Sequence, residues 1–279
     1  MFDFLSFTFF QNALVAGVLA SIACGIIGTY VIIRRMVAIS GGISHAAFGG
    51  IGIGYYLGIE PLLGALVFTT GAAITMGELE RRAHQHMDTL IGAVWATGMA
   101  LGILFIYLSP GFAPDLFGYL FGNILLIPRI ELLILACLVA VIVITVGLLF
   151  NDLCAVTFDE EYATVTNLPV TTLTRILLVL IAFTVVMLIQ VVGIILVIAL
   201  LTLPAAISRE FSGDVKTMMI CAALLGMVFT TTGIFLSAAF DVPSGATIIL
   251  ISAGAYAGTL LLKKMIRRSA GRLQPSRSS

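Results

Sequence analysis

The chain has 279 residues, of which 60% are hydrophobic and only 10% are charged, and its mean hydropathy is +1.17. Soluble domains carry about a quarter of their residues as charges, so this composition excludes a water-soluble globule and predicts an integral membrane protein. The 14 basic and 14 acidic residues balance. The net charge therefore gives no bulk attraction to nucleic acid, and no nucleic-acid partner is expected.

Long intervals without charged residues separate the clusters of charge along the chain. The intervals are 12–33, 36–59, 62–77, 89–114, 132–151, 176–208, 217–240 and 242–262. Most reach the roughly 20 residues that a helix needs to cross a bilayer core, and only helices or closed barrels satisfy their backbone there. We therefore predict an all-α, polytopic membrane bundle of eight or nine transmembrane helices, with residues 1–262 forming a single transmembrane domain.

Two segments leave the number of crossings open. The interval 176–208 is too long for one ordinary span, and Gln190 and Gly193 lie near its middle. This suggests two short crossings or a re-entrant pair, with one long tilted helix as the simpler alternative. Residues 116–128, "LFGYLFGNILLIP", predict a surface or half-inserted helix.

Basic residues predict which ends of the spans face the cytoplasm. Six of them lie in residues 263–279 with no acid among them, so this segment is expected to be a disordered cytoplasmic tail against anionic membrane lipid. Glu60, Asp115 and Asp241, in loops without basic residues, are then expected outside. Nine crossings would place the amino terminus outside, and eight would place it inside. Other cytoplasmic loops are expected at Arg34, Arg35, Arg81, Arg82, Arg175, Arg209 and Lys216.

His45 is the only Asp, Glu, Lys, Arg or His side chain within the charge-free intervals. Such groups are costly at membrane depth and usually face a pathway or a partner, and neutral imidazole is a common ligand of transition metals. The alternative is a histidine that is hydrogen-bonded between helices or close to the cytoplasmic surface. Gly50, Gly54 and Gly58 follow at i, i+4 and i+8, so they predict a helix face that packs closely against another helix.

The longest polar loop, residues 151–174, is expected on the cytoplasmic side. Asp159, Glu160 and Glu161 predict the start of a short helix, and Asn167 and Pro169 predict its end. Such a helix is either a solvated connector or an element that a soluble partner binds in order to move the spans.

Five segments in this order resemble the ABC-type permeases of zinc, manganese and iron uptake systems, the ABC-3 permease family. They are "GTYVIIRRMVAISGGISHAAFGG", "LFGYLFGNILL", "FDEEYATVTNLPV", "VVGIILVIALLTLPAAIS" and "DVPSGATIIL". The resemblance covers nearly the whole chain. It implies a multi-pass permease subunit of the cell membrane that is not itself an enzyme and holds no permanent cofactor. The implied partners are a cytoplasmic ABC ATPase dimer, an extracytoplasmic metal-binding protein and a second permease copy, and the implied cargo is Zn²⁺ or Mn²⁺.

The resemblance also implies roles for the residues of the polar loop. The family's ATPase-docking pattern, D-x-E-x-A followed by a glycine and a hydrophobic residue, falls on Asp159, Glu160, Glu161, Ala163, Asn167 and Leu168. Asn167 departs from the usual glycine. Because asparagine also tolerates the left-handed conformation that ends many helices, we expect docking to survive.

A second departure concerns the family pattern G-D-A-x-S-H-x-x-x-P-G. Ser44 and His45 match it, but Gly41 stands at the aspartate position and Gly49 at the proline position. A carboxylate at i and an imidazole at i+4 would share a helix face and form half of a metal site. This chain lacks that carboxylate.

Two interpretations of the missing carboxylate remain open. Either transit needs only His45, doubled by the second copy, or another acid substitutes, with Asp241 and Glu60 as the candidates. Loss of an oxygen ligand weakens the case for manganese more than that for zinc, so zinc is expected as cargo, with manganese or iron as alternatives.

Three other functions compete with a metal importer. A permease for another ABC substrate, such as a chelated metal, would have the same general pattern. An ion-driven secondary transporter usually needs acids within its spans, and the charge-free intervals contain none. An intramembrane enzyme would need a catalytic constellation, whereas Ser44 and His45 are adjacent in sequence and point to different sides of a helix.

Overall fold

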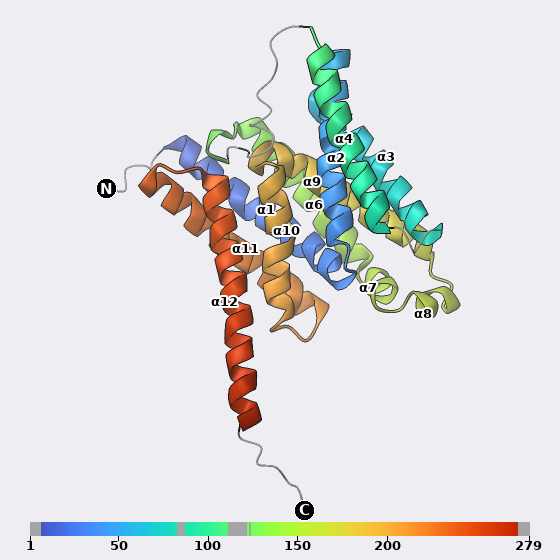
Figure 1. Cartoon of the computed structure of the whole chain (residues 1–279). Helices are drawn as coiled ribbons and strands as arrows, with labels where there is room; N and C mark the ends of the chain where they lie inside the picture. Colours follow the sequence, from blue (N-terminus) through green and yellow to red (C-terminus); the bar gives the residue numbers. More distant parts are fainter. Residues whose placement is uncertain (1–6, 83–86, 111–121, 123, 273–279) are drawn as a thin grey trace, which may run out of the picture.

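The computed structural model describes residues 7–82, 87–110, 122 and 124–272, and all the regular structure in these residues is helical (Figure 1). The predicted all-α class is confirmed. The helices, in chain order, are α1 (Thr8–Ile33), α2 (Val37–Leu57), α3 (Pro61–Arg82), α4 (Met87–Leu108), the 3₁₀ turn η2 (Ile124–Leu126), α6 (Arg129–Leu148), α7 (Phe150–Phe158), α8 (Glu160–Val165), α9 (Val170–Val192), α10 (Ile194–Arg209), α11 (Val215–Phe240) and α12 (Ser244–Arg272).

Among the described helices, eight are long and apolar enough to span a bilayer: α1, α2, α3, α4, α6, α9, α11 and α12. The 16-residue α10 is apolar but shorter. The predicted surface helix at 116–128 falls mostly outside the described residues, and its last part contains only the turn η2.

The interval 176–208 contains a helix break, so the alternative of one long tilted helix is wrong. Gly193 separates α9 from α10 with φ +79° and ψ 157°, a conformation that side chains with a Cβ rarely adopt. Gly122 packs against this break so closely that a Cβ there would collide with the carbonyl carbon of Val192. The break is therefore fixed both by local backbone geometry and by a neighbour distant in sequence.

The short helix α10 connects the two ends of the bundle. Its first residues follow Val192, which lies against Gly122, whereas its last residue, Arg209, reaches the carbonyl of Ile32 at the end of α1. With α10 included, nine described helices run from end to end. Counted this way, the start of α1 at Thr8 lies on the side opposite the end of α12, which is the expected outer side.

In the described part of the chain, the basic residues that form ion pairs gather at one end of the bundle. Arg34 at the end of α1 pairs with Glu160 of α8, Arg175 of α9 pairs with Glu78 of α3, and Lys263 of α12 pairs with Glu210 after α10. This end is the lower one in Figure 1. It contains α7 and α8, which agrees with the predicted cytoplasmic side.

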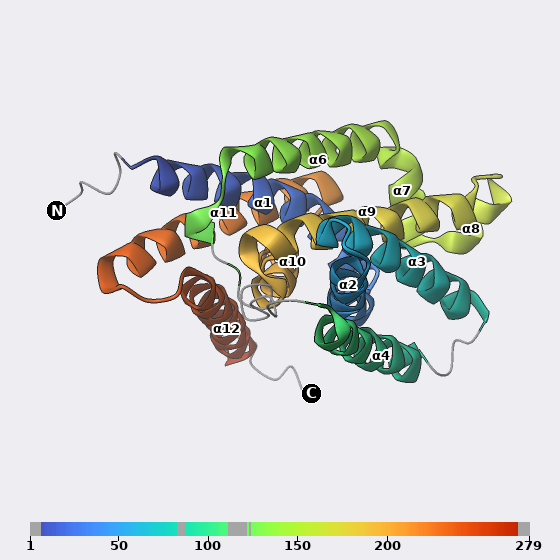
Figure 2. The same cartoon turned by 90° about the horizontal axis from the view of Figure 1, so that it is seen from above.

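Packing places α1 inside the bundle, in contact with α6, α10 and α11. The helices α2, α3 and α4 form a separate group to one side, with α2 in contact with both of the others, and α12 lies at the opposite side (Figures 1 and 2). One cluster of buried apolar side chains draws on every described helix from α1 to α12.

The predicted disordered tail differs from the structure in its first part. Helix α12 continues ten residues past Leu262 to Arg272, and residues 273–279 lie outside the described part. Residues 263–272 include strong helix formers, namely lysine, methionine, arginine and alanine, and their first glycine is Gly271. The hydropathy of the chain falls after Leu262, but the helix continues to Arg272.

Candidate functional site

Glycines let α2 approach α3 at backbone distance. A Cβ on Gly50 would lie 2.6 Å from the Cα of Ala65, and one on Gly54 would lie 2.8 Å from the Cα of Pro61. Both glycines therefore pack against α3 as expected. Gly58 does not pack against α3 in this way, because α2 ends at Leu57 and Gly58 is the residue that follows it. With φ +67° and open space around its Cβ position, Gly58 forms the left-handed end of the helix.

The opposite side of α2 is equally close to α4. A Cβ on Gly98 would lie 2.6 Å from the Cα of Ala46, and one on Gly52 would lie 2.7 Å from the Cα of Gly102. Residue numbers rise together along the two helices, so α2 and α4 run parallel in this contact. We call the contact the α2–α4 seam.

His45 lies in this seam, stacked on Trp95 of α4. The ring centroids are 3.9 Å apart and the ring planes differ by 10°. His45 is half-buried, and the side chain of Trp95 is 41% exposed. Nδ1 of His45 is buried, and none of the described groups forms a hydrogen bond with it. Among the described residues, the imidazole is therefore positioned by the stacking contact with Trp95 and not by a hydrogen bond to Nδ1.

Trp95 lies 50 residues away from His45 in the sequence, and the residue pattern around His45 does not point to it. Two signals for it exist in the sequence. Trp95 is the only tryptophan, and Gly98 and Gly102 after it repeat the small-residue spacing of α2.

The candidate acids lie away from His45. Glu60 is exposed and comes directly before Pro61, the first residue of α3. Because α2 continues twelve residues beyond His45, the outer end of α2 is about 18 Å from it along the helix axis. Asp241 is exposed beyond the end of α11, in a left-handed conformation with φ +53°. Within the described part of a single chain, no three His, Cys, Asp or Glu side chains gather in a way that could hold a metal ion.

The position of the missing carboxylate is open. Gly41 is buried, but a Cβ built on it would have no heavy atom within 4 Å outside its own helix backbone. It stands one helical turn before His45. An aspartate side chain therefore has room at this position.

The predicted docking helix is α8, which is capped at both ends. Asp159 begins it, and its carboxylate accepts a hydrogen bond of 2.8 Å from the N–H of Tyr162. At the other end Asn167 has φ +58°, which is the predicted left-handed cap. The N–H of Leu168 donates to the carbonyl of Ala163 and that of Asn167 to the carbonyl of Thr164, so the two bonds form a Schellman motif.

The faces of α8 differ in exposure. Ala163 is fully buried, and Leu168 packs against the apolar core. Glu161 is exposed, and Tyr162 and Val165 are 60% and 81% exposed. Exposed apolar groups beside an acid, on a helix that is fixed at both ends, form a suitable surface for a soluble protein partner.

Arg34 joins α8 to the spans. Its guanidinium lies 2.7 Å from a carboxylate oxygen of Glu160 and donates to the hydroxyl of Thr174 in α9 at 3.2 Å. Only 14% of the Arg34 side chain is exposed. Arg34 therefore links α8 directly to α1 and α9 through one largely buried side chain.

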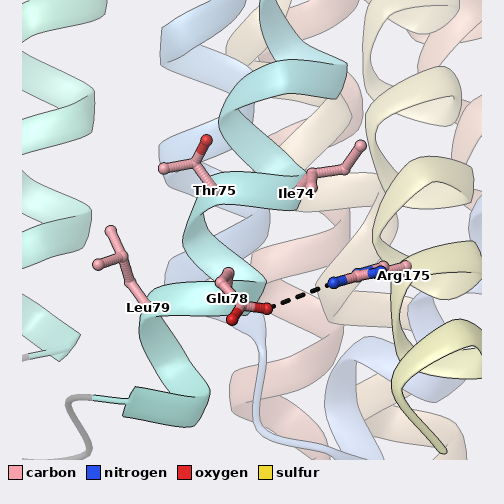
Figure 3. A pocket seen from close by; sticks show the side chains of 5 residues that line it. All are labelled: Ile74, Thr75, Glu78, Leu79 and Arg175. Carbon is pink, nitrogen blue, oxygen red and sulfur yellow. Dashed lines mark hydrogen bonds and ion pairs between the residues drawn. The ribbon is translucent and has the colours of Figure 1, made fainter.

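A second contact at this end joins α3 to α9. Arg175 and Glu78 are 3.4 Å apart, and the ion pair lies along a groove of about 550 Å³ that Ile74, Thr75 and Leu79 also line (Figure 3). Arg175 is 53% exposed, so the pair contributes little to stability. The ion pair does mark where the group formed by α2, α3 and α4 meets the rest of the bundle.

Eight described helices that are long and apolar enough to span a bilayer, joined by close glycine-rich contacts, define a multi-span membrane protein. Residues 6–263 match the ABC 3 transport family, and the chain belongs to this family. Permeases of this kind are membrane subunits rather than enzymes.

Individual relatives agree with this assignment. An uncharacterised membrane protein of Synechocystis is 50% identical, over 95% of this chain and 94% of its own length. The manganese transport system membrane protein MntC of Halalkalibacterium halodurans is 32% identical, over 91% of this chain and 87% of its own. The solved structure of PsaBC from Streptococcus pneumoniae in complex with Fab has a TM-score of 0.83 and 31% identity, covering 92% of both chains.

Proposed function

We propose that this chain is the membrane subunit of an ABC importer for a divalent transition-metal ion. The observation that supports this most strongly is α8, which is capped at both ends, exposes an apolar and acidic face, and is linked to two spans by Arg34. A permease that carries no ATPase of its own needs such a surface. Two copies of the chain would then act with a cytoplasmic ATPase dimer and an extracytoplasmic metal-binding protein.

The proposed cycle follows from the two ends of the bundle. The metal-binding protein docks at the end that holds Glu60 and Asp241, and the ion enters between the two copies. His45 holds it briefly, since an ion in transit must bind weakly enough to leave. Closure of the ATPases displaces α8, and Arg34 transmits the movement to α1 and α9.

Two observations bear on which metal is transported. Relatives at 31–32% identity are named for manganese, in Halalkalibacterium halodurans and in Streptococcus gordonii. The expectation of zinc rests only on the missing carboxylate at Gly41. We therefore propose manganese first, with zinc as the second candidate because a lone imidazole without an oxygen ligand suits it better.

The central experiment measures ATP-dependent uptake of Mn²⁺ and Zn²⁺ into vesicles that contain the assembled transporter. His45→Ala is expected to abolish uptake while the complex still assembles, and Glu161→Lys is expected to reduce binding of the ATPase. Normal uptake with His45→Ala would refute the metal role of this residue. Uptake that does not depend on ATP would instead favour a secondary transporter.

A second variant tests the choice of metal. Gly41→Asp restores a carboxylate one turn before His45, in a position with room for it. The variant is expected to raise the ratio of Mn²⁺ to Zn²⁺ uptake, because an oxygen ligand favours the harder ion. Gly41→Asn is the matched control of similar shape without the charge, and an equal change in both variants would contradict a role for the carboxylate.

A further inference from the structure

The stack of His45 on Trp95 is imposed by the packing of the α2–α4 seam. Glycines above the stack bring the two backbones so close that a Cβ on Gly98 would lie 2.6 Å from the Cα of Ala46. Flat side chains fit into such a narrow space with their faces parallel, which is what the 10° angle between the rings records. The orientation of the imidazole is therefore set by α4.

Nothing described along the edge of the imidazole replaces this constraint. A histidine that binds a metal through one nitrogen usually donates its other N–H to an acceptor, which fixes the ring. Here Nδ1 of His45 is buried, and the described residues offer it no hydrogen-bond partner. Trp95, whose ring centroid lies 3.9 Å from that of His45, is a contact that can determine the plane of the imidazole.

The indole also has the right electronic character. Metal ions bind imidazole in the plane of the ring through a nitrogen, which leaves the stacked face in place. Binding withdraws electron density from the imidazole and gives it positive character, and the electron-rich face of tryptophan is the best aromatic partner for positive charge. The stack therefore stabilises the metal-bound ring more than the free ring.

We propose that Trp95 is a positioning residue for the transported ion: it orients the imidazole of His45 and stabilises that ring while it carries the metal. This proposal rests on the proposed function of His45. Trp95 does not bind the metal itself. It affects how strongly His45 binds the metal.

The chain provides its own probe of this contact, because Trp95 is its only tryptophan. The full chain is purified without the ATPase and the metal-binding protein, placed in lipid vesicles, and titrated with MnCl₂ and with ZnCl₂ while tryptophan emission is recorded. A saturable change in emission is expected, because the ion is bound by a ring 3.9 Å from the indole. The change should be absent in His45→Ala. An equal change in that variant, or no change in the unaltered chain, would overturn the proposal.

Transport by the complete complex provides the second measurement. An aromatic stack contributes about two- to tenfold in an equilibrium, so Trp95→Leu should lower the rate of uptake at limiting metal by about that factor. Trp95→Phe keeps a ring in the seam and should recover most of the rate. Tyr107→Leu, on the same helix at a side chain 86% exposed, is the matched control. Equal losses with leucine and phenylalanine at position 95 would show that stacking is not what matters.

A third pair of variants displaces the stack without altering either ring. Gly98→Ala forces α2 and α4 apart, whereas Gly92→Ala, on the same helix, has open space around the new methyl group. Only the first should change the emission of Trp95 and reduce uptake, and unchanged emission in Gly98→Ala would contradict the seam argument.

The failures of the two proposals are distinguishable. Normal uptake with His45→Ala removes the metal role of His45 and with it the proposed function of this site. Loss of uptake with His45→Ala, together with full uptake by Trp95→Leu, overturns the role of Trp95 alone.

Discussion

We expect Asn167 to determine whether α8, the proposed docking helix, is formed before the ATPase binds. Helix α8 has six residues, well below the roughly 12–15 that an isolated helix needs in water, so its caps decide its population. Asn167 closes the Schellman motif at φ +58°, a conformation that costs a residue with a Cβ about 1–2 kcal/mol. Asparagine lowers this cost through its short polar side chain, and glycine removes it.

Three substitutions at this position form a graded series. Asn167→Gly should leave the ordered population of α8 unchanged or raise it, because glycine has no Cβ to strain. Asn167→Ala should cost about 1 kcal/mol, which is roughly a fivefold loss of ordered helix. Asn167→Val should cost more, since a β-branched residue is rarer still at positive φ.

The assay is the dissociation constant between the detergent-solubilised permease and its ATPase subunits. If the helix must be ordered to bind, the affinity should fall in the order Gly and Asn, then Ala, then Val. Thermal unfolding of each variant provides a control, because the midpoint should change little when only a surface helix loses its cap. Equal affinity for all four residues, or weaker binding with glycine than with valine, would contradict a role for the left-handed cap in ATPase binding.

Two further predictions concern packing and coupling. Gly50→Ala should lower the free energy of unfolding by about 1–3 kcal/mol, because the new methyl group meets the backbone of α3. Gly71→Ala has open space around its methyl group and should not lower it. Equal unfolding midpoints for the two variants would contradict this prediction. Arg34→Met removes the contacts to Glu160 and Thr174 and should raise the number of ATP molecules hydrolysed per ion imported, with the complex still assembled. An unchanged ratio would show that α8 acts on the spans by another route.

Much of the architecture was predictable because the bilayer restricts the sequence so strongly. Charged side chains are excluded from its core, so the spacing of charges marks the spans, and the basic residues mark one end. The ends of α8 were predictable for a local reason. Capping depends on a few neighbouring residues, and an asparagine in left-handed conformation completes the Schellman motif as the sequence indicates.

The remaining features depend on contacts between distant segments. Gln190 and Gly193 indicate a disturbance in the interval 176–208, but the break at Gly193 is stabilised by Gly122, some 70 residues earlier. Gly58 continues the glycine spacing of α2, yet it ends the helix, because the chain turns there into α3. The spacing of the glycines predicts which face of the helix packs against a neighbour, but only the packing of the chain shows where the helix ends.

The amino-acid sequence alone shows that this protein spans a membrane, predicts eight or nine helical crossings, and singles out His45 as the exceptional side chain within them. Composition and charge spacing carry this information because each residue must separately suit lipid or water. The packing of the helices sets the surroundings of His45. It keeps Glu60 and Asp241 away, leaves open space at Gly41, and places Trp95 flat against the imidazole. That neighbourhood depends on how closely two glycine-rich helices approach, which no single helix specifies.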